Sequence, residues 1–245
     1  VGDVQSSPFA GNPRAVVDAA LCTACGLCAE VCRFAAISAT SFGPPVFDPL
    51  SCEGCGRCAN LCPADAIAMH PGVAGEACLG TSDIGTVSFG RLEPGEDLSG
   101  KLVTEVRRLG AEAAAAAGAD VMLIDGPPGI GCPLIAAVTG SDLVVAVTEP
   151  TISGAHDLSR LLEVTGRFEL PVLVVLNKAD LSASGAVRIR DLCSSSGLQL
   201  VAEVPFDRML ADIASDPGQH RLRVTPGGQA LSSAWECVET TLGLS

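Results

Sequence analysis

Four short apolar runs recur in the second half of the chain, and segments with a helical pattern separate them. The runs are Val121–Asp125, Leu143–Val147, Val172–Leu176 and Leu200–Val204, with helical segments at Ile130–Thr139, Gly154–Phe168 and Ala186–Ser196. A longer helix is predicted over Ser99–Ala117, ending at Gly118. Apolar strands that alternate with helices are typical of βαβ units and a parallel sheet covered on both faces. The pattern therefore predicts an α/β fold whose ligands bind at the carboxyl ends of the strands.

The chain before residue 73 follows a different pattern. Residues 1–17 are apolar without a helical period, and short strands are expected at Ala36-Ile37 and Val46-Phe47. Ala66–Met69 repeats the first of these strands. We therefore predict a small α+β domain over residues 18–72, inserted into an α/β domain made of residues 1–17 and 73–245.

Composition narrows the class of protein. The 245 residues, 48% of them hydrophobic, suffice for one α/β domain with a small insert. The formal charge of -13 argues against a nucleic-acid partner, which needs a basic surface, and would suit a basic redox partner. No apolar run has the length of a membrane span, and no leader segment is recognised. Twelve cysteines favour a reducing compartment, so a cytoplasmic location is expected.

Eight of the cysteines form two runs with the spacing C-x2-C-x2-C-x3-C, which is the spacing of a bacterial two-cluster ferredoxin. In this pattern, three cysteines of a run hold one iron–sulfur cluster and the fourth holds the other cluster. Two [4Fe-4S] clusters are therefore predicted. The expected ligands are Cys22, Cys25, Cys28 and Cys62 for cluster 1, and Cys52, Cys55, Cys58 and Cys32 for cluster 2.

Other interpretations of the cysteines are weaker. A zinc site needs four ligands in two pairs, and a disulfide framework belongs to short secreted chains. Gly26, Gly54 and Gly56 lie beside ligand cysteines, where the backbone must curl around a cluster without a side chain in the way. Arg33 follows Cys32 where Pro63 follows Cys62; its charge either raises a cluster potential or faces water. Most of the remaining cysteines are expected to be buried as small hydrophobic residues: Cys78, Cys132, Cys193 and Cys237.

Polar motifs follow two of the predicted strands. Asp125-Gly126-Pro127-Pro128-Gly129 suits a carboxylate that positions magnesium or water, although it could equally be a βα turn capped by aspartate. Asn177-Lys178-Ala179-Asp180 has the N-K-x-D form that reads a purine base, with the aspartate favouring guanine. A helix N-cap is the simpler interpretation of the same residues.

Together these motifs resemble the MinD/ParA-type P-loop ATPases, specifically the Mrp-like members that carry an inserted ferredoxin domain. The similarity extends to Ser99–Val103, Val147–Thr151 and Pro205–Asp207, and so covers nearly the whole chain. It implies that Asp125 and the residues 126–129 after it lie near Mg-ATP, and that Asn177, Asp180 and Pro205 border the base. It also implies ATPase activity, nucleotide-sandwiching homodimers, and electron transfer or cluster handling coupled to ATP binding.

One part of the family pattern is not found. The family begins with a strand and a glycine-rich Walker A loop, whereas Gly95–Lys101 matches G-x4-G-K with Leu102 in place of the magnesium-binding hydroxyl. Glu96 and Asp97 would also repel phosphate there. We therefore expect the first strand and phosphate loop to lie upstream of Val1, and nucleotide affinity to be poor. The alternatives are an electron-transfer or cluster-carrying protein with a vestigial nucleotide domain, and an inactive remnant.

Overall fold

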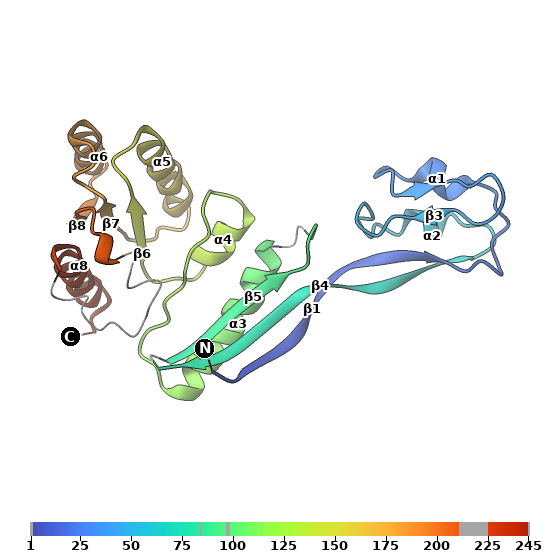
Figure 1. Ribbon diagram of the computed structural model, residues 1–245, viewed down its shortest axis with the longest axis horizontal. Helices are drawn as coiled ribbons and strands as arrows, with labels where there is room; N and C mark the ends of the chain where they lie inside the picture. The colour runs from blue at the N-terminus through green and yellow to red at the C-terminus, as the bar shows by residue number, and fades with distance from the viewer. Residues whose placement is uncertain (1, 84, 97–98, 211–224, 245) are drawn as a thin grey trace. The chain divides into compact units, whose positions relative to one another are not determined.

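In the computed structural model, which describes residues 2–83, 85–96, 99–210 and 225–244, the chain divides into two units. The first unit ends at Met122 and the second begins at Leu123. Each unit has its own sheets (Figure 1) and its own hydrophobic clusters. The two units are therefore described separately.

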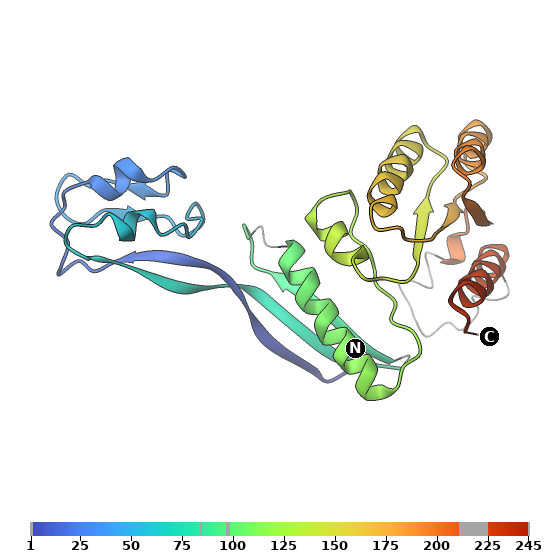
Figure 2. The same cartoon turned by 180° about the vertical axis from the view of Figure 1, so that it is seen from behind.

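The sheet of the first unit is antiparallel, with strand order β1-β4-β5. Strand β1 (Val4–Val17) pairs with β4 (Ile67–Ser82) along almost its whole length, from Val4 opposite Gly80 to Val17 opposite Ile67. Strand β5 (Gly85–Leu92) pairs with the second half of β4. Helix α3 (Ser99–Ala117) lies along this sheet, as Figures 1 and 2 show from opposite sides. Leu102 of α3 packs there against Phe9, Ala74 and Ala77.

The cysteine-rich region occupies the connection between β1 and β4. It contains helices α1 (Leu27–Val31) and α2 (Arg57–Asn60) and the small strand pair β2 (Ile37–Ser38) and β3 (Val46–Phe47). Its core consists of Ala15, Ile37, Cys58 and Ile67. Because Ala15 and Ile67 belong to β1 and β4, the paired strands form the base of this region.

The second unit is an α/β layer structure with the parallel strand order β6-β7-β8. The strands are β6 (Val144–Thr148), β7 (Val172–Asn177) and β8 (Gln199–Val204), and the helices are α4 (Cys132–Val138), α5 (Ile152–Gly166), α6 (Ala183–Ser195) and α8 (Pro226–Leu242). Val174 and Leu176 pack with residues of α5 and α6 on one face of the sheet. Val175 and Val204 pack with Ala234 of α8 on the other face. The arrangement is visible in Figure 2.

Most of the elements predicted from the sequence are confirmed. Helix α3 has the predicted bounds, and three of the four apolar runs are the strands β6, β7 and β8. The predicted strand at Val121–Asp125 is wrong, because the described residues 121–127 form neither strand nor helix. Val121, Met122 and Leu123 are exposed instead. A strand needs a hydrogen-bonded neighbour, and an apolar sequence does not by itself supply one. The antiparallel sheet of the first unit was not foreseen.

The described helices include none that is both long and apolar enough to span a membrane.

Candidate metal centre

Each of two hollows in the cysteine-rich region is lined by four cysteines. One hollow of about 360 Å³, counting space open to solvent, has Cys22, Cys25, Cys28 and Cys62 in its wall. The other, of about 340 Å³ on the same measure, has Cys52, Cys55, Cys58 and Cys32. Each hollow thus takes three cysteines from one run and the fourth from the other run. The structure brings together the two sets of residues that the spacing predicted.

Two short helices produce this crossed arrangement. Helices α1 and α2 begin after Gly26 and Gly56, whose left-handed φ angles of 79° and 71° turn the chain sharply. The third cysteine of each run then lies in the first turn of its helix. At the end of α1 the backbone of Cys32 is extended (φ -75°, ψ 111°), so the chain leaves the helix there. One helix therefore supplies a cysteine to each hollow.

The second loop is held more closely than the first. A Cβ atom on Gly54, which has φ +67°, would lie 2.3 Å from the carbonyl oxygen of Pro13. The equivalent residue of the first run, Ala24, has a similar φ of 54° but carries a side chain. The loop of Cys52–Cys58 is therefore packed directly onto strand β1.

The environments of the thiols bear on metal binding. Burial is the main cause that raises the pKa of the Cys28 and Cys58 thiols above the ordinary value. The backbone N–H groups of Ala24 and Ala66 donate to the Sγ atoms of Cys22 and Cys62 at 3.4 Å and 3.3 Å. The thiolate is the form of cysteine that binds metal. Metal binding at Cys28 and Cys58 would release the protons that burial retains.

The donor set fits an iron–sulfur cluster better than a single ion. Throughout the described ranges, no three Cys, His, Asp or Glu side chains converge as one metal ion would require. Four sulfurs spread around a hollow suit a [4Fe-4S] cluster, whose four iron atoms each bind one thiolate. The remaining cysteines lie elsewhere. Cys78 and Cys193 are buried as expected, but Cys237 is only half-buried and Cys132 is exposed.

The candidate nucleotide residues lie in the second unit. At the ends of β7 and β8, Asp180 Oδ1 accepts a hydrogen bond from the Phe206 backbone N–H at 2.6 Å, next to Pro205. The Asn177 side chain accepts from the Lys178 N–H at 3.0 Å. Lys178 Nζ also pairs with Glu149 Oε1, after β6, at 2.6 Å. These contacts join the loops after all three parallel strands, and no local motif predicts the contact with Glu149.

The other predicted nucleotide residues are not gathered there. Residues Asp125–Gly129 lie in the segment that forms neither strand nor helix, and among the described residues no hydrogen bond joins Asp125 to Asn177 or Asp180. In the Gly95–Lys101 motif, Asp97 and Leu98 lie outside the described residues, and Ser99–Lys101 begin α3. The roles that the resemblance implies for Asp125 and the residues 126–129 therefore stay predictions.

The fold and the two hollows define an iron–sulfur protein with an α/β unit. Residues 21–66 match the family model of the 4Fe-4S dicluster domain. The chain is 40% identical over 157 residues to an uncharacterised protein of Methanocaldococcus jannaschii, covering 64% of this chain and 53% of that protein. It is also 32% identical over 90 residues to a protein of Mesostigma viride described as a septum site-determining protein MinD, covering 35% and 32%.

Among solved structures, the chain is similar to the MinC:MinD cell division protein complex of Aquifex aeolicus, with a TM-score of 0.49, 20% identity and 66% of each chain covered. The chain spans about half the length of the first curated relative and about a third of the MinD relative. The curated match over 90 residues supports the resemblance to MinD-type proteins that the sequence motifs indicate. The chain thus combines a match to the 4Fe-4S dicluster domain with a parallel α/β unit, and 90 of its residues are similar to a MinD-type protein.

Proposed function

We propose that the chain holds two [4Fe-4S] clusters and transfers electrons through them. Cys22, Cys25, Cys28 and Cys62 hold cluster 1, and Cys52, Cys55, Cys58 and Cys32 hold cluster 2. The observation that carries this proposal is the crossed lining of the two hollows, each by four cysteines. The dicluster family match over residues 21–66 supports it.

The bound clusters supply one-electron chemistry, and the chain determines where this occurs. Helix α1 joins the two sites, since Cys28 at its start serves cluster 1 and Cys32 at its end serves cluster 2. Buried apolar residues such as Ile37 and Ile67 shield the inner sides of the sites from water. Cys25 and Cys55 are exposed, so electrons have a short route to a partner docked outside. The acidic charge of the chain suits a partner with a basic surface.

The test is anaerobic reconstitution followed by iron and sulfide assays and spectroscopy of the reduced protein. About eight irons and two reducible centres are expected for two clusters. Cys32→Ala and Cys62→Ala should each weaken a different cluster, whereas Cys132→Ala, which changes an exposed cysteine outside both hollows, should weaken neither. Electron transfer is checked by oxidation of the reduced protein with a basic one-electron acceptor protein. Binding of four irons or fewer, or clusters that do not cycle reversibly, would overturn the proposal.

We propose further that the second unit binds Mg-ATP weakly, mainly through its base, and couples this binding to the clusters. The ties between the loops after β6, β7 and β8 support a base site near Asn177, Asp180 and Pro205. Calorimetry with Mg-ATP and Mg-GTP on the reconstituted protein tests this, and sedimentation with nucleotide tests for the homodimer. The parent protein should release or absorb heat on nucleotide binding, and Asn177→Ala should abolish this signal. No heat from either nucleotide would leave electron transfer or cluster carrying as the activity of this chain.

A further inference from the structure

One arginine links the cysteine-rich region to the turn that precedes helix α3. Arg14, on strand β1, donates from Nη1 to the backbone carbonyl of Cys52 at 2.5 Å. Its Nη2 is paired with the carboxylate of Glu96. The exposed fractions of the two side chains are 22% and 11%, so this pair is largely shielded from water. Cys52 is the first cysteine of the loop that lines the second hollow.

Two further contacts place the same loop and turn together. Gly54 lies against the backbone of Pro13, the residue before Arg14. Leu50 approaches Gly95, since a Cβ atom added to Gly95 would lie 3.5 Å from the Cδ2 atom of Leu50. The turn itself is closed by a hydrogen bond from Glu96 N–H to the Glu93 carbonyl at 3.1 Å. The Arg14–Glu96 pair is therefore part of a packed junction rather than a contact between mobile side chains.

The first hollow lacks a comparable charge. Its lining residues, all within the described chain, carry no charged side chain, whereas Glu53 and Arg57 line the second hollow. The first hollow has amide donors instead, from Ala24 and Ala66 to Cys22 and Cys62. Among the described residues, neither Arg14 nor Glu96 is hydrogen-bonded to the loop of the first hollow. The two sites thus differ in what can alter their electrostatic environment.

We propose that the charges of the Arg14–Glu96 pair set the reduction potential of cluster 2 and leave that of cluster 1 largely unaffected. The inference rests on the proposed function, because it assumes both clusters. Reduction adds one negative charge to a cluster, and a nearby positive charge favours this step. Arg14 is hydrogen-bonded to the ligand loop directly, while Glu96 offsets part of its charge. A change of charge at the turn before α3 should therefore change the reduction potential of cluster 2.

The two halves of the pair predict shifts of opposite sign. Arg14→Met leaves Glu96 uncompensated and should lower one of the two midpoint potentials. Glu96→Gln leaves Arg14 uncompensated and should raise the same potential. If the pair had only a structural role, both variants would shift the midpoint potential in the same direction, because each breaks the same contact. Arg188→Gln, which removes an exposed positive charge from α6, is the matched control and should shift neither potential.

The experiment is a dithionite potentiometric titration followed by EPR on the anaerobically reconstituted chain. Iron and sulfide contents, measured first, test the proposed function separately from this inference. Placing Glu96→Gln in the Cys62→Ala background should retain the shift, and placing it in Cys32→Ala should abolish it. If Arg14→Met fails to hold cluster 2, Arg14→Lys replaces it as a variant that keeps the charge. The shift of the midpoint potential in Glu96→Gln then still tests the proposal. Shifts of equal sign, shifts of both clusters together, or no shift from Glu96→Gln would overturn the proposal.

Discussion

At the scale of single residues, the two cysteine loops show how a repeated motif can be held differently. Both loops need left-handed backbone at the residue before the second cysteine, and Ala24 and Gly54 both adopt it. Only at Gly54 does a neighbouring strand take the space that a side chain would fill. The glycine is therefore required by packing against Pro13 as well as by its φ angle.

Gly54→Ala is expected to lower the iron content by about half, because a clash at 2.3 Å with the Pro13 carbonyl would push the second loop off β1. Gly56→Ala is the control, since Gly56 has a similar φ of +71° with nothing within 4 Å of an added Cβ. It should cost only about 1 kcal/mol of backbone strain and retain both clusters. Equal losses of iron in the two variants would show that the positive φ angle, and not packing against Pro13, determines whether the cluster is retained.

Asp207 connects the end of β8 to the start of α8. The Thr225 hydroxyl, chiefly, and backbone N–H groups including those of Met209 and Gly227 donate to its carboxylate and lower its pKa. A lowered pKa contributes stability that is present above the unfolded value, about 3.9, and is lost as the pH falls through the folded value. Asp207→Asn should therefore flatten the loss of stability below about pH 4. Fluorescence of Trp235, the one tryptophan of the chain, follows this unfolding from within α8. An unchanged acid profile would exclude a role for Asp207.

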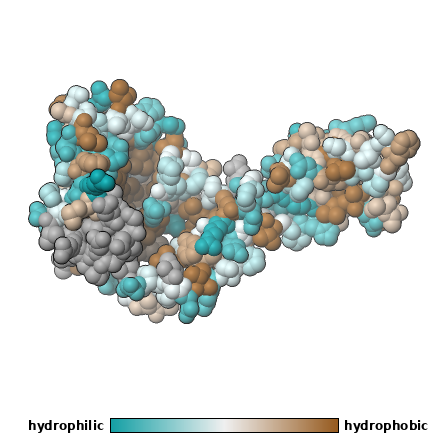
Figure 3. Space-filling model, in the orientation of Figure 1, coloured by the Kyte–Doolittle hydropathy of each residue, from teal (hydrophilic) through white to brown (hydrophobic). Residues whose placement is uncertain are grey.

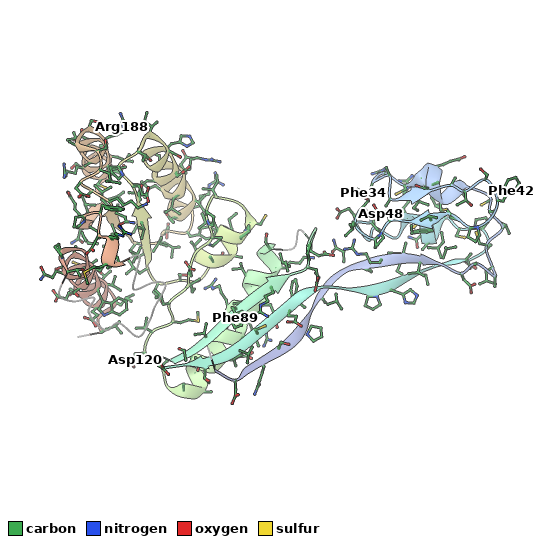
Figure 4. All side chains as sticks on the ribbon, in the orientation of Figure 1. Phe34, Phe42, Asp48, Phe89, Asp120 and Arg188 are labelled. Atoms are coloured by element: carbon green, nitrogen blue, oxygen red, sulfur yellow. The ribbon has the colours of Figure 1, made fainter. Side chains whose placement is uncertain are left out.

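The sequence allowed the residues of each hollow to be predicted, because cysteine spacing is local and the crossed pattern follows from it. The junction at Pro13, Arg14 and Glu96 could not be predicted. These residues are far from Cys52 in the chain, and a single arginine or glutamate gives no sign of its partner. Figure 4 also shows Phe34 and Asp48 at one end of the cysteine-rich region and Phe42 at the other. Nothing in the residue types indicated which end each would occupy.

At the scale of elements, the helices of the second unit begin at residues whose side chains satisfy free backbone N–H groups. Thr151, Ser182 and Thr225 are the N-caps of α5, α6 and α8, and each accepts a hydrogen bond from the glycine three residues later. The predicted helical segments Gly154–Phe168 and Ala186–Ser196 overlap α5 and α6, whereas α8 is not predicted by the sequence pattern. The run Val121–Asp125 does not form the predicted strand, because a local sequence pattern does not specify a hydrogen-bonded partner strand.

Thr151→Ala should destabilise the second unit by about 1 kcal/mol, since the Gly154 N–H then loses its acceptor at 2.8 Å. Thr151→Ser keeps the hydroxyl and is expected to stay close to the parent protein. Chemical denaturation followed by Trp235 fluorescence measures both. A serine variant as unstable as the alanine variant would argue that the methyl group of Thr151, rather than its cap, matters.

At the scale of the whole molecule, the two units have separate cores, and their surfaces carry different chemistry. The cysteine-rich region exposes Phe42 at 98% and Leu50 at 70%, and hydrophobic patches are visible on it in Figure 3. The second unit contains the candidate nucleotide residues and Trp235. Cluster absorbance and tryptophan fluorescence therefore report on different units of one chain.

Ile189→Ala should lower the stability of the second unit by about 2–5 kcal/mol, because Ile189 is fully buried in the core shared by α5, α6 and the sheet. The Trp235 transition should move to lower denaturant, while the cluster absorbance should be lost at the same concentration as before. The reciprocal variant, Ile67→Ala, should affect the cluster signal first. If both signals moved together in either variant, the units would have to unfold as one.

The pairing of β1 with β4 has a consequence for the order of folding. Every residue from Asp18 to Ala66 lies between Val17 and Ile67, which are opposite each other in the register. The strands can meet only after this long connection has closed, and closing it costs conformational entropy. Cluster insertion shortens the free connection, because Cys32 and Cys62 then bind across the two runs. We expect cofactor loading to come before zippering of the strands, which pulse-labelled hydrogen exchange with and without iron and sulfide would test.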